Sequence, residues 1–229
     1  MKVLGVIPAR GGSKGIPRKN LSLVNGKPLI EYTIEQAKAS ELLEDVILST
    51  DDSEIAEVGI SLDINVPFIR PSELAEDDTS TIDVLFHLCQ FLAKQGRAFD
   101  AICLLQPTSP QRPPDLIDKC IERFMISNSD SLVTLSEVSH GYNPSWQYVE
   151  VGNGRFELVT GGVEPIPRRQ LLKSTYIRDG RIYLSKVSTI LNCHSMFGSS
   201  LTGYVVEPGV NVDTPEDLEE LKKQLSRDF

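Results

Sequence analysis

The chain has 229 residues, with 32 acidic and 23 basic side chains and a formal net charge of −9. That length fits one large domain, or one domain with an extension, and the acidic balance argues against a nucleic-acid or anionic-membrane partner. No apolar run approaches the length of a membrane span, and strand-like sequence begins at once without a signal-peptide pattern. We therefore expect a cytoplasmic protein that binds neither nucleic acid nor membrane.

The first stretch of the chain predicts a buried strand that leads into a cationic loop. Residues 3–8 are apolar and rich in β-branched side chains, and residues 9–20 contain three glycines and four cations. Residues 1–30 hold six basic side chains and no acidic one. Backbone amides and positive charge at one point predict a site for a small polyanion such as a phosphate chain. The alternative is a solvated turn with scattered lysines.

Helical and strand-like segments alternate after this loop. The pattern predicts helices at 29–39, 53–61, 82–94 and 114–126, and strands at 45–50, 64–69, 101–105 and 131–135. Asn25-Gly26 is a turn signal, and Asp52 or Ser53 is a candidate helix cap. Strands at 182–184 and 203–206 and a helix at 214–225 follow, the helix starting with Thr214 as N-cap and Pro215 at its first position.

Residues 140–179 interrupt this alternation. They are rich in Gly, Pro and aromatic side chains, and residues 146–151 alternate in a way that predicts a β-hairpin. A segment of this length outside the βα pattern is usually functional or used in association. The sequence therefore predicts an α/β, Rossmann-like three-layer fold, a single domain over 1–229 with a mostly parallel sheet and an inserted hairpin arm at about 138–180.

Two loops are expected to meet in one crevice. The strand at 101–105 ends at Gln106, and ligands of parallel sheets collect at the carboxyl ends of the strands, so Gln106 should face the same crevice as Arg10. The loop lacks the Gly-Lys-Ser/Thr of a P-loop, and its glycine spacing does not fit a dinucleotide fingerprint. The loop is therefore one whose amides can bind oxygen atoms while its four cations neutralise charge, which suits a nucleoside triphosphate that releases pyrophosphate.

The four cysteines, Cys89, Cys103, Cys120 and Cys193, are widely spaced, with no Cys-x-x-Cys pair and no histidine at metal-ligand spacing. We expect free, mostly buried thiols instead of a zinc site or a disulfide framework.

Residues 7–21, Ile-Pro-Ala-Arg-Gly-Gly-Ser-Lys-Gly-Ile-Pro-Arg-Lys-Asn-Leu, resemble the signature of the acylneuraminate cytidylyltransferases, the CMP-sialic acid synthetases and their legionaminic and pseudaminic acid relatives. Four further stretches agree in order, at residues 49–52, 70–71, 105–110 and 212–218. The resemblance thus spans almost the whole chain.

The resemblance implies that CTP and a nine-carbon 2-keto-3-deoxy sugar acid give the CMP-sugar and pyrophosphate. The anomeric hydroxyl attacks the α-phosphorus, so catalysis consists mainly of positioning and of neutralising charge on the phosphoryl oxygens. Mg²⁺ is the implied ion, because it is hard and suited to bridging phosphate oxygens. The resemblance also implies a homodimer, with the inserted hairpin as the dimerisation arm.

Roles follow from the resemblance position by position. The catalytic residues are Arg10, Lys19 and Asp213, and Asp213 also holds the metal. Gln106 matches the contact to the sugar acid, and Arg169 matches an arm residue that reaches the partner's sugar site. The nucleotide-binding residues are Arg10, Ser13, Lys14, Lys19, Asn20, Arg70 and Ser80.

One departure concerns the metal. Relatives often read Asp-x-Asp before the last helix, whereas this chain reads Asn211-Val212-Asp213, and an amide carries no charge. The general base stays open between a metal-bound hydroxide and Asp213. Structural alternatives also stay open: Asp213 as a helix cap, Gln106 as a partner for loop backbone, and Arg169 as a solvated arm residue.

Two rival functions remain at this point. The first is the related cytidylyltransferase for the eight-carbon acid Kdo, whose loop typically resembles Arg-Tyr-x-Ser and not the Arg10-Gly11-Gly12-Ser13 of this chain. The second is a non-catalytic nucleotide-binding module of the same fold. Asn211 favours this second reading, while Lys14, Lys19 and Gln106 weigh against it.

Overall fold

The computed structural model describes residues 1–226 of the chain. Residues 1–134, 180–204 and those from 209 onward form a larger compact unit, and residues 135–179 and 205–208 form a smaller one. None of the helices in residues 1–226 is long and apolar enough to cross a membrane.

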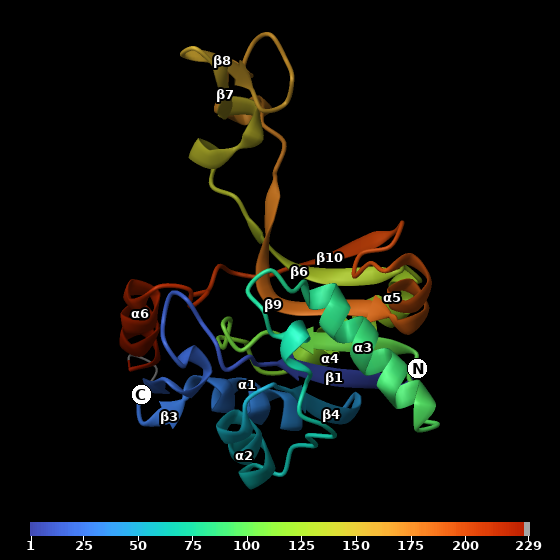
Figure 1. Ribbon diagram of the computed structural model, residues 1–229. Coiled ribbons are helices and arrows are strands. Elements are labelled where there is room, and N and C mark those ends of the chain that lie inside the picture. Colours follow the sequence, from blue (N-terminus) through green and yellow to red (C-terminus); the bar gives the residue numbers. More distant parts are fainter. Residues whose placement is uncertain (227–229) are drawn as a thin grey trace. The chain divides into compact units, whose positions relative to one another are not determined.

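A six-stranded sheet has the order β10-β6-β9-β5-β1-β4. Strand β1 pairs in parallel with β4 and β5, and β9 runs antiparallel to β5. The predicted α/β fold with a mostly parallel sheet is confirmed (Figure 1). The strand bounds are Val3–Pro8 for β1, Leu43–Ser49 for β4, Ala101–Leu105 for β5, Ser131–Glu137 for β6, Tyr176–Lys186 for β9 and Leu201–Val205 for β10.

Strand β1 lies inside the sheet between β4 and β5, and its burial explains its sequence. Val3, Leu4, Val6 and Ile7 are fully buried, as expected for a strand covered on both faces. The strand ends at Pro8, where the chain turns into the cationic loop. Strand β5 is also buried at every position and ends one residue before Gln106.

Helices cover the sheet between successive strands. Along the chain, α1 lies between β1 and β4, and α2 and α3 lie between β4 and β5. Figure 1 shows α1 and α2 side by side, and their residues are in contact. The helix bounds are Leu29–Lys38 for α1, Ser53–Ser61 for α2, Thr81–Lys94 for α3, Leu116–Ser127 for α4, Val187–Cys193 for α5 and Pro215–Leu225 for α6.

The C-terminal helix packs on residues from the beginning of the chain. A buried cluster joins Ile16, Val24 and Leu29 to Val212 and Leu221. Figure 1 shows the red α6 beside the blue segments that include the strand β3 (Lys27–Pro28). This packing places the residues just before α6 next to the cationic loop.

The predicted start of α6 is confirmed. Thr214 is the N-cap and accepts a hydrogen bond from the Asp217 backbone amide, while the Asp217 carboxylate accepts from the Thr214 amide. Pro215 occupies the first position of the helix. The structural role proposed for Asp213 therefore belongs to Thr214 and Asp217.

One expectation for a single element was wrong, and one helix was missed. Residues 64–69 form no strand and make only isolated bridges to the edge of the sheet, at Asn65 and Ile69, because Pro67 between them has no N–H to donate to a ladder. The sequence also gave no signal for α5, whose Val-Ser-Thr-Ile run is rich in β-branched residues that are typical of strands.

The smaller unit contains the predicted hairpin. Strands β7 (Tyr148–Gly152) and β8 (Arg155–Leu158) pair antiparallel around Asn153-Gly154, and both turn residues have the positive φ that an Asn-Gly turn supplies. Trp146 donates its indole N–H to the Ile166 carbonyl at 2.6 Å, which ties the unit together.

All four cysteines are free, as expected. Cys89, Cys103 and Cys120 are buried, and Cys193 is exposed.

Candidate nucleotide-binding site

A cavity of about 420 Å³ lies where β1 and β5 end. Its lining includes residues from the loop after β1, from the loop after β5 and from the segment before α6. The expectation that Arg10 and Gln106 face one crevice is confirmed. Eight of the residues singled out from the sequence line this cavity: Arg10, Ser13, Lys14, Lys19, Asn20, Arg70, Gln106 and Asp213.

Ser80 and Arg169 are not among the lining residues. Ser80 is the N-cap of α3, where its hydroxyl accepts a hydrogen bond from the Asp83 amide and donates one to the Asp83 carboxylate. Its neighbours Thr79 and Thr81 do line the cavity. Arg169 lies in the smaller unit, in a short 3-10 helix at Arg169–Leu171.

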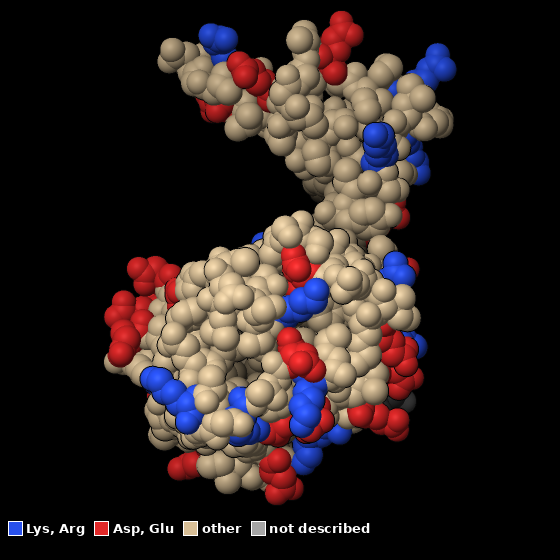
Figure 2. Space-filling view, turned by 90° about the vertical axis from the view of Figure 1, so that its right-hand side faces the viewer, with Lys and Arg blue, Asp and Glu red and all other residues tan. Residues whose placement is uncertain are grey.

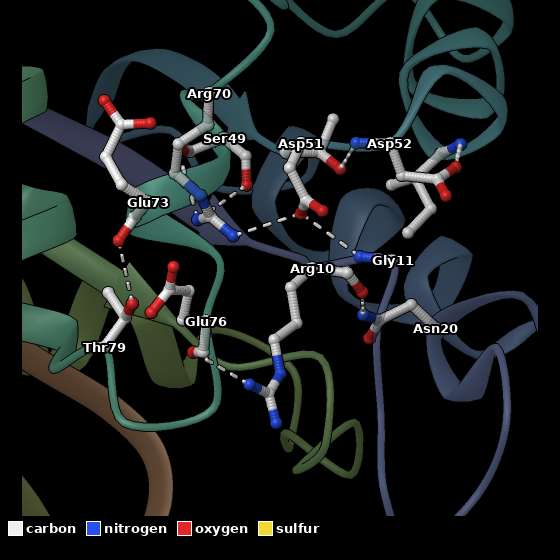
Figure 3. Close-up of polar contacts among 12 residues, drawn as sticks. Arg10, Gly11, Asn20, Ser49, Asp51, Asp52, Arg70, Glu73, Glu76 and Thr79 are labelled. Carbon is white, nitrogen blue, oxygen red and sulfur yellow. Dashed lines mark hydrogen bonds and ion pairs between the residues drawn. The ribbon is translucent and has the colours of Figure 1, made fainter.

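The loop after β1 is held by backbone contacts with the neighbouring strand. Its first amide, on Ala9, donates to the Ser49 carbonyl, and the Gly11 amide donates to Asp51 Oδ1 at 3.2 Å. Asn20 is buried, and its amide donates to the Arg10 carbonyl at 2.9 Å (Figure 3). Asn20 therefore holds the shape of the loop as well as lining the cavity.

Two loop cations share one carboxylate that the sequence reading missed. Arg10 Nη1 lies 3.1 Å from Asp77 Oδ1, and Lys14 Nζ lies 2.8 Å from Asp77 Oδ2. Arg10 also donates to the Glu76 carbonyl, as Figure 3 shows. The Lys14 ammonium holds the pKa of Asp77 below its usual range. The acidic run Glu76-Asp77-Asp78 is the sequence signal that could have identified a partner for the acid-free loop.

Lys19 and Asp213 form the second charged pair of the cavity. Lys19 Nζ donates to Asp213 Oδ1 at 3.0 Å and to the Val212 carbonyl at 2.8 Å. The side chain of Lys19 is only 14% exposed, whereas that of Asp213 is 62% exposed. The lysine is thus fixed by its surroundings, and the carboxylate keeps an open side toward solvent.

Glycine at position 15 lets these two segments approach. A Cβ on Gly15 would overlap the carbonyl oxygen of Asp213, so any other residue would push the loop and the segment before α6 apart. Gly12 differs, because a Cβ there would meet nothing within 4 Å.

Arg70 is a buried cation in the lining of the cavity. Its guanidinium donates to the Ser49 carbonyl at 3.3 Å and lies 3.4 Å from Asp51 Oδ1 (Figure 3). Burial lowers the pKa of Arg70, and the charge of Asp51 opposes this shift. Because Asp51 also binds the Gly11 amide, Arg70 and the cationic loop are connected through one carboxylate.

Arg112, which the sequence reading also missed, shapes the loop that carries Gln106. This buried arginine donates to the Gln106 carbonyl at 2.8 Å and to the Arg181 carbonyl at 2.9 Å. It also bonds Thr33 and Gln36 of α1. The Gln106 carbonyl thus accepts hydrogen bonds from both Arg112 and the Ser109 backbone amide. No local pattern distinguishes such a residue from an exposed arginine.

The four cations of the loop after β1 are all paired with carboxylates: Arg10, Lys14, Arg18 and Lys19. On the separate face of the larger unit that Figure 2 shows, Lys and Arg also lie next to Asp and Glu. A nucleic-acid groove needs a broad face of unpaired basic side chains. A few cations within an acidic surface instead suit a small anion that binds at one point.

No group of three or more His, Cys, Asp or Glu side chains within residues 1–226 is arranged to hold a metal ion. Asp213 is the acidic residue of the cavity that was expected to bind Mg²⁺, and its exposed carboxylate is the hard oxygen donor that this ion prefers. A single carboxylate fits Mg²⁺ where phosphate oxygens and water complete the coordination.

Comparison with known proteins agrees with this geometry. The family model described as Cytidylyltransferase matches residues 4–144. The chain is 32% identical to the pseudaminic acid cytidylyltransferase of Campylobacter jejuni, over 96% of this chain and 94% of that protein. It is also 32% identical to the CMP-N,N'-diacetyllegionaminic acid synthase of Legionella pneumophila, over 95% of this chain and 93% of that protein.

A solved structure of CMP:2-keto-3-deoxy-manno-octonic acid synthetase complexed with CTP superposes with a TM-score of 0.74, at 21% identity and over the full length of both chains. At that identity the likeness concerns the fold. The family match and the two sequence relatives go further: this chain belongs to the cytidylyltransferase family. It is therefore a nucleotidyltransferase enzyme, as the resemblance of residues 7–21 predicted.

Proposed function

We propose that this protein is a CMP-sugar synthetase that transfers the cytidylyl group of CTP to a nonulosonic acid, a nine-carbon 2-keto-3-deoxy sugar acid. The observation that carries this proposal is the meeting of Arg10, Lys14, Lys19 and Asp213 in one cavity of a cytidylyltransferase. Relatives at 32% identity are named for pseudaminic and legionaminic acids, both of this class.

The reaction joins the anomeric oxygen of the sugar acid to the α-phosphorus of CTP. The bond from that phosphorus to the oxygen bridging the α- and β-phosphates breaks, and its electron pair leaves with pyrophosphate. Arg10, Lys14 and Lys19 neutralise the charge that grows on the phosphate oxygens, which is the largest contribution such a site can make. The hydroxyl proton is lost to Asp213 or to water.

Mg²⁺ is the proposed cofactor. Asp213 would hold it together with phosphate oxygens and water, because its carboxylate is exposed and Oδ1 keeps a second lone pair beside the one that accepts from Lys19. A bound Mg²⁺ supplies Lewis-acid neutralisation of the phosphate charge. The protein's own part is to hold Asp213 and Lys19 within 3.0 Å of each other before substrate arrives.

Gln106 is the proposed contact to the sugar acid. It lines the cavity at the end of β5, and Arg112 holds its backbone in place. Arg169 is proposed to serve the sugar site of a second copy of the chain, since it is exposed on the smaller unit. Ser80 is proposed to act at the nucleotide site indirectly, by starting α3 beside the lining residue Thr81.

We also propose that the protein is a homodimer joined by the smaller unit. Many apolar side chains of this unit are about half exposed or more, among them Tyr148, Val149, Val151, Phe156 and Val163. A two-stranded hairpin with so much exposed apolar surface is marginal alone and gains stability when that surface is covered. The double variant Val149→Lys with Phe156→Glu should sediment as a monomer, and a dimer that persists unchanged would contradict this interface.

We place the reaction in the cytoplasm, where CTP is available and the thiols stay reduced. Four free cysteines, three of them buried, are consistent with that compartment.

The experiment that tests the proposed function is a pyrophosphate-release assay with purified protein and Mg²⁺. CTP, UTP and ATP are each combined with N-acetylneuraminic, legionaminic and pseudaminic acids and with Kdo. We expect release with CTP and at least one nine-carbon acid, and little with the other triphosphates. Turnover with Kdo alone would indicate the eight-carbon enzyme, and no release from any pair would indicate a non-catalytic nucleotide-binding module.

A further inference from the structure

A chain of hydrogen bonds connects the loop after β5 to the carboxylate of Asp213. Ser109 is buried, and its hydroxyl donates to Asn211 Oδ1 at 3.0 Å. The amide nitrogen of Asn211 donates to Asp213 Oδ2 at 2.5 Å. The other oxygen of Asp213, Oδ1, accepts from Lys19 Nζ at 3.0 Å. Each oxygen of Asp213 is therefore fixed by a different neighbour.

This chain determines which way the Asn211 amide points. If the amide were turned over, its oxygen would face the Asp213 carboxylate, and two acceptors would meet without a proton between them. The observed orientation directs the nitrogen to Asp213 and the oxygen to Ser109. Asn211 Oδ1 thus accepts a hydrogen bond from Ser109 and is not directed toward Asp213.

We propose that Asn211 is a positioning residue and not a metal ligand. Ser109 holds the Asn211 side chain, and the Asn211 amide nitrogen binds Asp213 Oδ2. Asp213 Oδ1, on the Lys19 side, is then the carboxylate oxygen that binds the cation. This inference rests on the proposed CTP-dependent function, because the cation is the one that accompanies the triphosphate. It also explains why this chain has Asn and not Asp at position 211. An aspartate there would place two negative carboxylates side by side, and they would repel each other whenever no cation is bound.

The packing around Ser109 supports the proposal. Gly180 has φ +86°, and a Cβ there would lie 2.6 Å from Ser109 Oγ and 3.7 Å from Asn211 Oδ1. The strand β9 can therefore pass this close to the hydroxyl only because residue 180 is glycine. The hydroxyl that orients Asn211 is confined on this side by backbone and not by a movable side chain.

The test measures Mn²⁺ binding, which needs no turnover. Free Mn²⁺ is counted by electron paramagnetic resonance in titrations of the whole protein, with and without CTP. Loss of groups that orient a metal ligand typically lowers metal affinity about 10- to 100-fold. We expect Asn211→Ala and Ser109→Ala each to lower the Mn²⁺ affinity in the presence of CTP about 10-fold. The double variant should be no worse than Asn211→Ala, because Ser109 acts through Asn211.

Matched controls are Ser61→Ala and Asn192→Ala, exposed positions on α2 and α5 that should leave the Mn²⁺ affinity unchanged. Thermal denaturation shows whether each variant folds. Asn211→Asp supplies a second carboxylate and should bind Mn²⁺ alone at least 10-fold more tightly than the wild type, as expected when a charged ligand is added.

Three results would overturn the proposal. The first is a double variant whose loss of Mn²⁺ affinity equals the sum of the two single losses. The second is a loss of Mn²⁺ affinity in Asn211→Ala with no change in Ser109→Ala. Either result would show that Asn211 acts by itself as a ligand. Absence of Mn²⁺ binding by the wild type with CTP would show that Asp213 holds no cation. CTP binding is measured in parallel by calorimetry. If the protein does not bind CTP at all, the proposed function fails; if it binds CTP but one of these three results is obtained, only the positioning role of Asn211 fails.

Discussion

At the scale of single residues, Lys19 is the least exposed of the four cations in the loop after β1. Its ammonium is held between the Val212 carbonyl and Asp213, and its side chain is largely buried. Lys19→Ala should lower kcat/KM about 100- to 1000-fold, because a preorganised charge at the reacting phosphate is lost. Steady-state pyrophosphate release measures this effect. Lys38→Ala, on the exposed end of α1, is the control, and near wild-type activity of Lys19→Ala would remove Lys19 from the site.

Asp77 is the residue whose removal should improve nucleotide binding. Its carboxylate pairs with both Arg10 and Lys14, so we expect an incoming triphosphate to compete with it for these two cations. Asp77→Asn should lower the Kd for CTP roughly 2- to 10-fold, since exposed ion pairs are individually weak. Isothermal titration calorimetry measures the change. Asp78→Asn alters the net charge equally from an exposed neighbouring position, and equal gains in both variants would mean that only overall charge matters.

At the scale of elements, the contact between the cationic loop and the segment before α6 depends on Gly15. Gly15→Ala should lower the free energy of unfolding by about 1–3 kcal/mol and reduce activity, because the new Cβ would separate Lys19 from Asp213. Urea denaturation and pyrophosphate release measure the two effects. Gly12→Ala is the matched control, since a methyl group fits there without contact. Equal behaviour of the two variants would contradict the close approach.

The turn after α5 provides a test by pH. Asp130 Oδ2 accepts hydrogen bonds from the Ser199 hydroxyl and from the Ser199 and Ser200 amides, which lower the pKa of Asp130 from 3.8 to about 2. A lowered carboxyl pKa stabilises the folded state above pH 3.8, and this stabilisation is lost as the pH falls toward 2. The wild-type urea midpoint should therefore exceed that of Asp130→Asn at pH 5, and the difference should shrink toward pH 2.5.

Asp63→Asn, at an exposed position, is the control for that comparison and should show little pH-dependent difference. A difference for Asp130→Asn that stays constant from pH 5 to pH 2.5 would mean that the carboxylate charge contributes nothing to the turn.

Elements with strong local signals could be predicted from the sequence, and elements decided by distant contacts could not. The apolar run of β5 and the Thr214-Pro215 start of α6 carry their structure in their own residues. The segment 64–69 has the composition of a strand, but Pro67 and its place beside the sheet edge limit it to isolated bridges. The helix α5 has strand-like composition, so only its packing, with α3 among its neighbours, selects the helix.

At the scale of the whole molecule, the candidate site also combines residues that local sequence predicts with residues that only distant contacts bring in. The cations of the loop after β1 are adjacent in sequence, and the rule for parallel sheets correctly joined them to Gln106. The partners of these cations could not be predicted, since Asp77 pairs with Lys14 and Arg112 with the Gln106 loop only after the chain has folded. The same is true of the Asn211 amide, whose direction depends on Ser109, about 100 residues earlier in the chain.

The whole chain carries a net charge of −9, yet both proposed substrates are anions. Local cations therefore have to overcome a repulsive average field, and they do so by concentrating in residues 1–30, where no acidic side chain occurs. Overall charge does not distinguish one triphosphate or sugar acid from another, so we expect the specificity to depend on the residues that line the cavity.

The measurement that tests the central claim most directly is ³¹P NMR of the protein with CTP, Mg²⁺ and the nonulosonic acid that is most active in the pyrophosphate assay. Attack at the α-phosphorus predicts equal amounts of pyrophosphate and of a new phosphodiester resonance, as the three CTP resonances disappear together. Formation of CDP and inorganic phosphate, or CTP resonances that persist with every nine-carbon acid, would contradict cytidylyl transfer by this protein.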